Sequence, residues 1–218
     1  MINHLIKGKN KLSVAFSGGS DSIFAAHLLS KRHKVTLYHY NHRLLDSDNE
    51  ICEQAVDAAF QLGLPIVVGT NRDEQYTKGS KEDWCRQLRY RFFGSLGGTL
   101  VTAHQLEDAS ESYMMGCLRG HPEYLPIPVS TIFGETLVVR PFLLTPKKVI
   151  KDYLDKYTLN HLVVDDPLNR SIAQTRNWLR LSLLPQIKER TNVEKVVKKR
   201  YLKYFEKNLL TKKKGVIC

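Results

Sequence analysis

Short apolar runs alternate with longer amphipathic segments over the first two thirds of the chain. The longer segments place apolar residues every three or four positions, which is the spacing of a helix that buries one face. Strands that alternate with helices predict an α/β fold. We expect a doubly wound, mostly parallel sheet of about five strands with helices on both faces. The short runs that we interpret as its strands are Lys11–Phe16, Val35–Tyr40, Leu64–Gly69, Thr99–Ala103 and Leu137–Arg140.

Local start signals support the helical segments. Ser80–Asp83 matches a capping box, and Thr145-Pro146 suits the N-cap and first turn of another helix. Beyond Thr145 the chain has a helical pattern, apart from a turn around Asp165–Asn169. We therefore expect an α/β domain over residues 1–145 and a helical extension with a basic tail over residues 146–218.

The composition is that of an ordinary globular protein, with 42% hydrophobic and 25% charged residues. The longest apolar runs fall short of the roughly 20 residues that span a bilayer, and Met1–Asn10 has no apolar core of the signal-peptide type. The cysteines are scattered without a C-x-x-C pair, so a zinc, iron–sulfur or dithiol site is disfavoured. We expect a cytoplasmic protein with no membrane partner.

The net charge of +11 is concentrated near the end of the chain. Ile187–Cys218 carries eleven Lys and Arg against three Glu, or +8, which leaves +3 for all preceding residues. Such a segment can be a solvated helix and tail, or it can contact a phosphate backbone. Charge alone does not favour either of these two interpretations.

A glycine-containing turn follows the first strand and precedes a helix. Glycines let the backbone approach a ligand, and the following helix offers N–H groups and the positive end of its dipole. Three serine hydroxyls add donors, so the segment predicts a cradle for pyrophosphate, although a plain strand-to-helix turn would also contain glycine. An aspartate beside phosphates implies a cation, and we assign Asp21 to Mg²⁺. The predicted cradle is Ser17-Gly18-Gly19-Ser20-Asp21-Ser22, which is neither a Walker A loop nor a GxGxxG fingerprint.

A second polar segment follows the fourth predicted strand, at the start of a helix. Asp108 and Glu111 are three residues apart and share a helix face, where they could bind Mg²⁺ or orient a substrate. His104 precedes them at the same strand-to-helix junction. Acids and polar residues at a helix start also serve as caps, so capping is the alternative for each residue taken singly.

Both segments resemble motifs of a known protein family. The Ser-Gly-Gly-Ser-Asp-Ser loop resembles the PP-loop ATP pyrophosphatase superfamily, whose members cleave ATP between the α and β phosphates and adenylate an oxygen. Thr102–Ser112 resembles the T-A-H-H-x-D-D-x-x-E-T signature of the tRNA(Ile)-lysidine synthetase family. Gln105, Glu107 and Ser112 depart from that signature, and Leu45 stands where the family's H-G-L-R segment has its Arg.

Further segments match that family in order over about residues 11–190. A helix with Arg86 and Arg89 resembles A-R-x-x-R-Y-x-x-F, and Asn177 and Arg180 belong to a segment that resembles R-N-x-x-R. The remaining matches are Leu118-Arg119-Gly120, Arg140-Pro141-Phe142-Leu143, Asp166-Pro167-Leu168-Asn169 and Leu183-Leu184-Pro185.

The resemblance implies a reaction on an isoleucine tRNA with a CAU anticodon. ATP adenylates the 2-carbonyl oxygen of the wobble cytidine, and the ε-amine of free lysine then displaces AMP to leave lysidine. Arg86 and Arg89 would stabilise charge on the phosphate. Asp108 or Glu111 would hold Mg²⁺, or orient and deprotonate the lysine ammonium, with His104, Asn177 and Arg180 in the same site. The expected partners are ATP, Mg²⁺, tRNA and free lysine, and a second copy of the chain in a homodimer.

Two other functions stay open. Within the superfamily, tRNA thiolation is the nearest alternative, although those enzymes generally need extra cysteines or a cluster. The substitutions at Leu45, Gln105 and Glu107 also leave room for a protein that binds tRNA in a nucleotide-dependent way without catalysis. Multiple turnover with lysine would distinguish the enzyme from a non-catalytic tRNA-binding protein.

Overall fold

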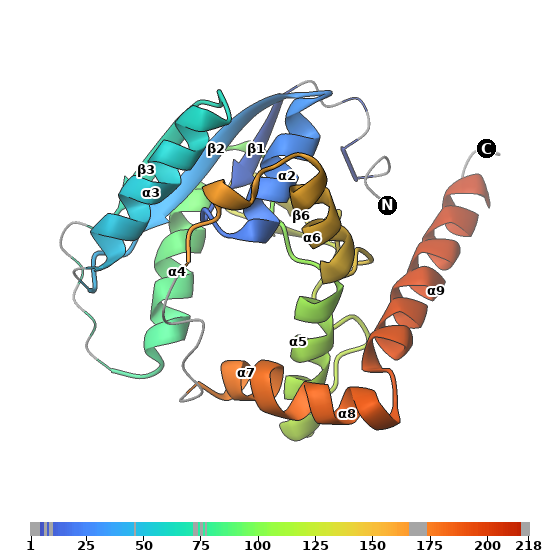
Figure 1. The fold of residues 1–218 in the computed structure, drawn as a ribbon. Coiled ribbons are helices and arrows are strands. Elements are labelled where there is room, and N and C mark those ends of the chain that lie inside the picture. The colour runs from blue at the N-terminus through green and yellow to red at the C-terminus, as the bar shows by residue number, and fades with distance from the viewer. Residues whose placement is uncertain are drawn as a thin grey trace. The chain divides into compact units, whose positions relative to one another are not determined.

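The computed structural model describes residues 5–6, 8, 11–45, 47–71, 74, 76, 78–165 and 174–214, with side chains placed as far as residue 208 (Figure 1). The chain divides into two compact units that interleave along the sequence. Unit 1 comprises Met1–Ala103, Val129–Pro141 and Lys148–Asp166, and unit 2 comprises His104–Pro128, Phe142–Lys147 and Pro167–Cys218. The Asp166–Asn169 motif lies outside the described residues.

Unit 1 contains the sheet, which confirms the predicted α/β fold. Its strand order is β3-β2-β1-β4-β6-β5, and every pair is parallel except β5 with β6. The core strands are apolar because both faces are covered: Val14, Leu37, Leu100 and Val138 are fully buried. The strands are β1 (Lys11–Ala15), β2 (Lys34–Asn41), β3 (Ile66–Thr70), β4 (Gly98–Val101), β5 (Ser130–Phe133) and β6 (Thr136–Val139).

The described sheet has six strands where the sequence pattern gave about five. The missed strand is β5, which pairs antiparallel with β6 through a tight turn at Gly134 (φ +52°). It lies at the edge of the sheet, and Ile132 points into solvent. A four-residue edge strand with an exposed apolar side chain has no buried face to create a periodic signal.

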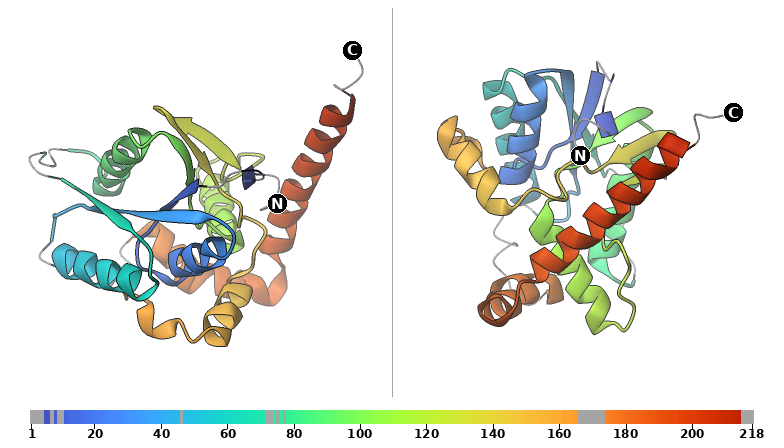
Figure 2. Two further views of the ribbon diagram at one scale, coloured as in Figure 1. Left: turned by 90° about the horizontal axis from the view of Figure 1, so that it is seen from above. Right: turned by 90° about the vertical axis from the view of Figure 1, so that its right-hand side faces the viewer.

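Helices cover both faces of this sheet. The helices α2 (Ser20–Ser30) and α3 (Ser47–Gln61) lie on one face, and α4 (Lys81–Gly94) lies on the other (Figure 2). Right-handed crossovers produce this arrangement where the strand order reverses after β3. The predicted cap of α4 is confirmed, since Asp83 N donates to Ser80 Oγ. The carboxyl ends of β1 and β4 therefore meet at one edge, which is where open α/β sheets bind ligands.

Unit 2 is helical. The longest helix packs against α5 through Val197 and Tyr201, and the Tyr201 hydroxyl donates to Ile127 O at 2.7 Å. Val196 lies one position off that face and is exposed. Among the described residues, no helix is both long and apolar enough to cross a membrane. The helices of this unit are α5 (Leu106–Leu118), α7 (Thr175–Trp178), a π-helical turn (Leu179–Leu183), α8 (Leu184–Arg190) and α9 (Val193–Lys214).

Candidate active site

The predicted phosphate cradle is a strand–turn–helix in unit 1. β1 ends at Ala15, and α2 begins at Ser20 directly after its N-cap, Gly19. Gly18 has φ +80°, and a Cβ at this position would lie 2.6 Å from Val164 Cγ2. A side chain is therefore excluded twice, by the backbone torsion and by the space. The backbone is held there by Val164 N, which donates to Gly18 O at 3.0 Å.

Ser22 braces the loop from inside. Its hydroxyl is buried, donates to Gly19 O at 2.8 Å and accepts from Ser17 N at 3.3 Å. Ser17 in turn is exposed, and its Oγ accepts from Gly19 N at 3.3 Å. The predicted hydroxyls thus differ in placement: Ser22 shapes the turn, whereas Ser17 lies at the surface where a ligand can reach it.

The loop has the chemistry of an anion site. Gly19 has no side chain that could cap α2, so the first turn presents backbone N–H groups and the positive end of the helix dipole. Gly18 lets the backbone turn sharply and pack against Val164, and Gly19 leaves the start of α2 without a side chain. Asp21, half-buried in the first turn of α2, is the only acid of the motif and fits an oxygen ligand for Mg²⁺.

The second predicted segment forms the start of α5 in unit 2. Gln105 is the N-cap: its side-chain oxygen accepts from Glu107 N at 2.7 Å, and its own backbone N donates to Asp108 Oδ2 at 3.0 Å. The residue that replaces a histidine of the family signature therefore completes a reciprocal cap. His104 lies immediately before the cap and is half-buried.

Glu107 has a structural partner. Both of its carboxylate oxygens accept from Lys147 N at 2.9 Å, at the first residue of α6 (Lys147–Lys156). Burial raises the pKa of Glu107, and the hydrogen bond from Lys147 opposes that shift. A carboxylate at a helix N-terminus complements the dipole there, so Glu107 fixes the beginning of α6.

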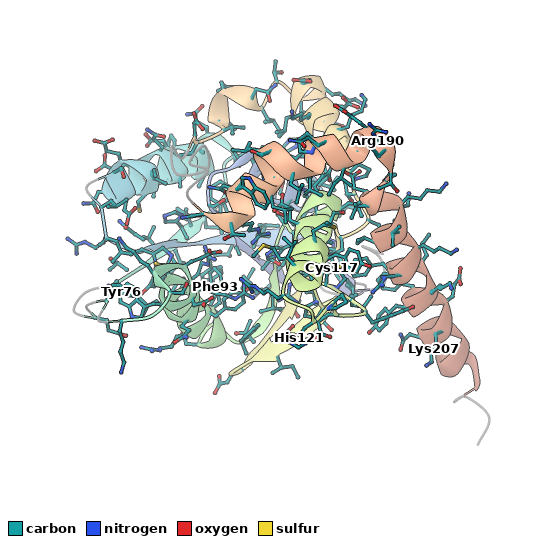
Figure 3. All side chains as sticks on the ribbon, turned by 90° about the horizontal axis from the view of Figure 1, so that it is seen from below. Tyr76, Phe93, Cys117, His121, Arg190 and Lys207 are labelled. Carbon is teal, nitrogen blue, oxygen red and sulfur yellow. The ribbon has the colours of Figure 1, made fainter. Side chains whose placement is uncertain are left out.

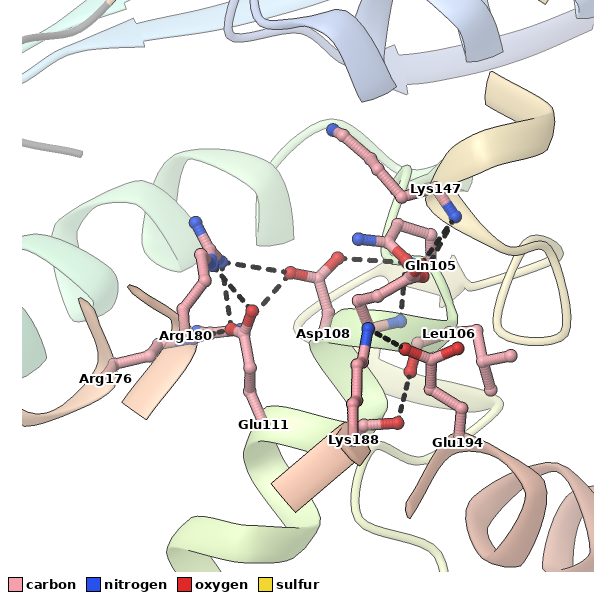
Figure 4. Close-up of polar contacts among 11 residues, drawn as sticks. Gln105, Leu106, Asp108, Glu111, Lys147, Arg176, Arg180, Lys188 and Glu194 are labelled. Atoms are coloured by element: carbon pink, nitrogen blue, oxygen red, sulfur yellow. Dashed lines mark hydrogen bonds and ion pairs between the residues drawn. The ribbon is translucent and has the colours of Figure 1, made fainter. Parts of the chain in front are cut away.

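Four charged side chains meet on the next turn of α5, as Figure 4 shows. Glu111 is only 2% exposed and accepts from Arg176 Nε at 3.0 Å and from Arg180 Nε at 2.6 Å. Asp108 Oδ1 lies 3.5 Å from the nearest nitrogen of Arg176 and 3.6 Å from that of Arg180. We call these four residues the ion-pair cluster. Two carboxylates and two guanidinium groups balance their charges, which is what burial of Glu111 requires.

The helix that supplies the arginines explains their convergence. Arg176 and Arg180 are four residues apart, one on α7 and one on the π-helical turn that follows. Residues at this spacing share a helix face. Arg176 was not among the predicted site residues. Its spacing of four residues from Arg180 could have identified it, because that spacing places both side chains on one helix face. Asn177 is buried and lies between them in sequence.

The predicted arginines of α4 remain at the surface of unit 1. The guanidinium carbon of Arg86 lies 4.8 Å from the ring centroid of Tyr90, within cation–π range. Arg89 has solvent-exposed surface, but the surrounding protein desolvates its guanidinium and lowers its pKa. Arginine keeps its charge under such shifts, so it can still face a phosphate.

Two histidines near Arg89 were missed by the sequence reasoning. Burial, aided by the Arg89 charge, lowers the pKa of His42 to about 4. The Nδ1 atom of His42 is buried and has no hydrogen-bond partner among the described residues. His39 Nδ1 lies 2.9 Å from Phe16 O, and burial lowers its pKa as well. Both imidazoles are therefore neutral at physiological pH.

Unit 2 also contains a small cavity of about 140 Å³ beside the ion-pair cluster. Its polar wall includes Glu107, Ser110, Lys188 and Glu194, with Lys188 Nζ paired to Glu194. Leu184, Pro185 and Val193 make the apolar wall. Apolar walls with a few fixed charges are typical of sites that bind an aliphatic chain with a polar end.

Comparison with known proteins finds one family over most of the chain. The model of the PP-loop domain family matches residues 1–187. A tRNA(Ile)-lysidine synthase of Alkalilimnicola ehrlichii is 32% identical over 81% of this chain and 42% of its own length. One of Clostridioides difficile is 26% identical over 90% of this chain and 46% of its own length. The chain thus spans less than half the length of these two relatives.

A solved structure shows the same fold. A U34-tRNA thiolase from Methanococcus maripaludis, solved with its [4Fe-4S] cluster, superposes with a TM-score of 0.72 at 15% identity. The match covers 93% of this chain and 75% of the thiolase chain. Within the described part of this chain, no group of three or more His, Cys, Asp or Glu is placed to hold a metal. At this identity the likeness extends to the fold alone.

Proposed function

Because the chain belongs to the PP-loop family, we propose that it uses ATP to adenylate the wobble cytidine of an isoleucine tRNA and joins lysine to it, forming lysidine. The observation that carries the proposal is the Ser17–Ser22 loop, which combines a left-handed Gly18 with a helix start that has no side chain at its N-cap, Gly19. The tRNA(Ile)-lysidine synthases that it resembles supply the substrate class.

The first step needs charge stabilisation at the phosphates. The 2-carbonyl oxygen of cytidine attacks the α-phosphorus of ATP, a new O–P bond forms, and pyrophosphate leaves with the electrons of the broken P–O bond. The backbone of Ser17–Ser22 would bind the leaving pyrophosphate, and Arg86 and Arg89 would stabilise charge on the α-phosphate. Asp21 would hold Mg²⁺, a cation that neutralises phosphate charge when bound.

The second step needs an amine that has lost its proton. The lysine nitrogen attacks C2 of the cytidine, the C–O bond to AMP breaks, and the ammonium gives up its proton to a base. Asp108 is the better placed acid, because its carboxylate is 15% exposed and lies 3.5 and 3.6 Å from the arginine nitrogens, whereas Glu111 is 2% exposed and accepts closer hydrogen bonds from both arginines. We assign Glu111 to holding Arg176 and Arg180 in position, and Asp108 to orienting the lysine ammonium. His104 precedes the cap of α5, and Asn177 lies on α7 next to Arg176.

The cavity of unit 2 offers a place for the lysine side chain. Its volume of about 140 Å³ and its apolar wall suit a short methylene chain. Glu107 and Glu194 put two carboxylates on the same wall. Substituting Ser110, which is buried and lines the cavity, with Val should raise the KM for lysine more than that for ATP.

The exposed face of α9 is the proposed tRNA contact of unit 2. Lys195, Lys198, Lys199 and Lys203 are exposed, whereas the buried face of the helix carries Val197 and Tyr201. Figure 3 shows Lys207 further along the same helix. Lysines on one side of a packed helix form a track for phosphates. A cytoplasmic location and a homodimer remain predictions of the sequence.

One observation favours a second function. In the ion-pair cluster both carboxylates are already neutralised by arginine, which is also how a purely structural cluster would look. A protein of this kind would bind tRNA in an ATP-dependent way without turnover.

Mass spectrometry of the tRNA separates these functions. The purified chain is incubated with ATP, Mg²⁺, lysine and a CAU-anticodon isoleucine tRNA transcript, and the fragment with the wobble base is analysed. The proposal expects that fragment to gain one lysine residue in amounts that exceed the enzyme. An unmodified fragment, with tRNA bound by the protein, would replace the proposal with the non-catalytic function.

A further inference from the structure

The amino edge of the sheet in unit 1 carries a cationic surface that the proposed reaction does not use. β1 begins at Lys11 and β2 at Lys34, and these two lysines are register partners across the parallel pair. Lys31 and Arg32 lie just before β2 and are exposed. The helix α2 separates this edge from the glycine loop by eleven residues, or about 16 Å. The surface is thus remote from the phosphate cradle within the same unit.

Two tyrosines from α6 and the residue after it anchor the cations. Lys31 Nζ lies 3.5 Å from the ring centroid of Tyr157 and 5.3 Å from that of Tyr153. The two rings are 4.6 Å apart, and the Tyr153 hydroxyl is 3.0 Å from His27 Nδ1. Lys156 Nζ lies 5.6 Å from the Tyr157 ring. A lysine held by aromatic rings gives up less side-chain entropy when it meets an anion.

Acidic side chains are scarce around this surface. The sequence from His27 to Thr36 contains no Asp or Glu, and neither does Lys11–Phe16. Of the two acids of α6, Asp152 is paired with Lys148, and Asp155 keeps its charge beside the neutral Asn160. The exposed cations thus outnumber these two acids.

We propose that this amino-edge patch, formed by Lys11, Lys31, Arg32, Lys34, Lys156 and Tyr157, binds the phosphate backbone of RNA at a distance from the reacting base. The inference rests on the proposed function, because the tRNA substrate would be the RNA. Charge complementarity selects the ligand: spaced point charges suit a chain of phosphates, and the exposed ring of Tyr157 suits a sugar or base face. Such contacts position a nucleic acid without reading its sequence.

A charge-matched pair of variants tests the patch. Lys31→Gln/Arg32→Gln removes two of its cations, and the control Lys78→Gln/Lys81→Gln removes two exposed lysines elsewhere in unit 1. Affinity for the isoleucine tRNA transcript and for an unrelated tRNA is measured over a range of salt concentrations. We expect the patch variant to weaken both by about tenfold and to flatten the salt slope by roughly two, one for each lost phosphate contact, with the control unchanged.

The remaining outcomes decide the inference separately from the proposed function. Equal affinity and slope for wild type and patch variant overturn the inference, whether or not lysidine forms. Loss of affinity for anionic phospholipid vesicles, with tRNA binding intact, would assign the patch to a lipid surface instead. Patch-dependent RNA binding without lysidine formation keeps the inference and overturns the proposed reaction. Tyr157→Phe, which keeps the ring over Lys31, should bind like the wild type, whereas Tyr157→Ala should resemble the patch variant.

Discussion

The glycine loop of unit 1 and the ion-pair cluster of unit 2 are formed by different kinds of chemical groups. The loop is backbone and hydroxyl, and its defining feature is the absence of a side chain at Gly18. The cluster is four long or charged side chains around the buried carboxylate of Glu111. A backbone site is fixed by a few consecutive residues, whereas a side-chain site depends on elements that meet only after folding. The two regions therefore respond differently to substitution.

The largest effect is expected at Gly18. An alanine there must adopt a left-handed torsion, and its Cβ would lie 2.6 Å from Val164 Cγ2. Gly18→Ala should therefore abolish ATP-dependent pyrophosphate release. Gly19→Ala is the matched control, since its φ is −69° and its added Cβ meets only Ser17 Oγ at 3.4 Å. Melting temperatures show whether each variant folds, and full activity of a folded Gly18→Ala variant would refute the backbone cradle.

Substitutions in the ion-pair cluster should mainly lower the stability of the protein. Glu111→Ala leaves Arg176 and Arg180 without their shared acceptor, and we expect a loss of about 3 kcal/mol, reduced from a fully buried case because both arginines are partly exposed. Urea unfolding measures it. Glu111→Gln, which keeps an acceptor, should lose less. If Glu111→Ala unfolds like the wild type, the cluster contributes no stability and its carboxylate is free for another role.

A pH effect sharpens the account of unit 1. His42 has a pKa of about 4 in the folded chain against about 6.5 when unfolded, so the unfolded chain binds more protons between these values. The contribution of His42 to the free energy of unfolding should be fully present above pH 6.5 and should be lost, by roughly 2–3 kcal/mol, as the pH drops to 4. His42→Gln should flatten this window relative to the wild type. Identical pH profiles of the two proteins would show that His42 is not buried neutral.

The smallest effect is expected on α9. Deleting this helix would remove the buried Val197 and Tyr201, so charge removal is the cleaner test. Lys195→Gln/Lys199→Gln should weaken tRNA binding severalfold and lower the salt slope by about two, with ATP affinity and melting temperature unchanged. A binding curve with the original slope would make this face ordinary solvated surface.

The sequence predicted what is local and missed what is distant. The loop at Ser17–Ser22 and the cap at Ser80 each consist of residues that are close together in the sequence, so the sequence alone can predict them. The contacts of Glu111 with Arg176 and Arg180 span 65 and 69 residues, and the sequence supplied both groups without showing that they pair. The edge strand β5 was missed because its apolar Ile132 faces solvent.

The two domains predicted over residues 1–145 and 146–218 remain a proposal. The compact units instead take α5 together with the late helices. This grouping follows from long-range packing, since Tyr201 on α9 bonds to Ile127 and the arginines of α7 and its π-helical turn bond to α5. The hydrophobic periodicity of residues 1–145 and of residues 146–218 gives no sign of these long-range contacts.

The most direct test of the account is a rapid-quench measurement on Asp108→Asn with ATP, Mg²⁺, lysine and the isoleucine tRNA. If the glycine loop serves adenylation and the ion-pair cluster serves the attack of lysine, pyrophosphate should appear at near the wild-type rate. Adenylated tRNA should accumulate while lysidine forms at least tenfold more slowly, because the amine lacks its orienting carboxylate. If pyrophosphate release and lysidine formation fall by the same factor and no adenylated tRNA accumulates, the two regions do not divide the reaction between them.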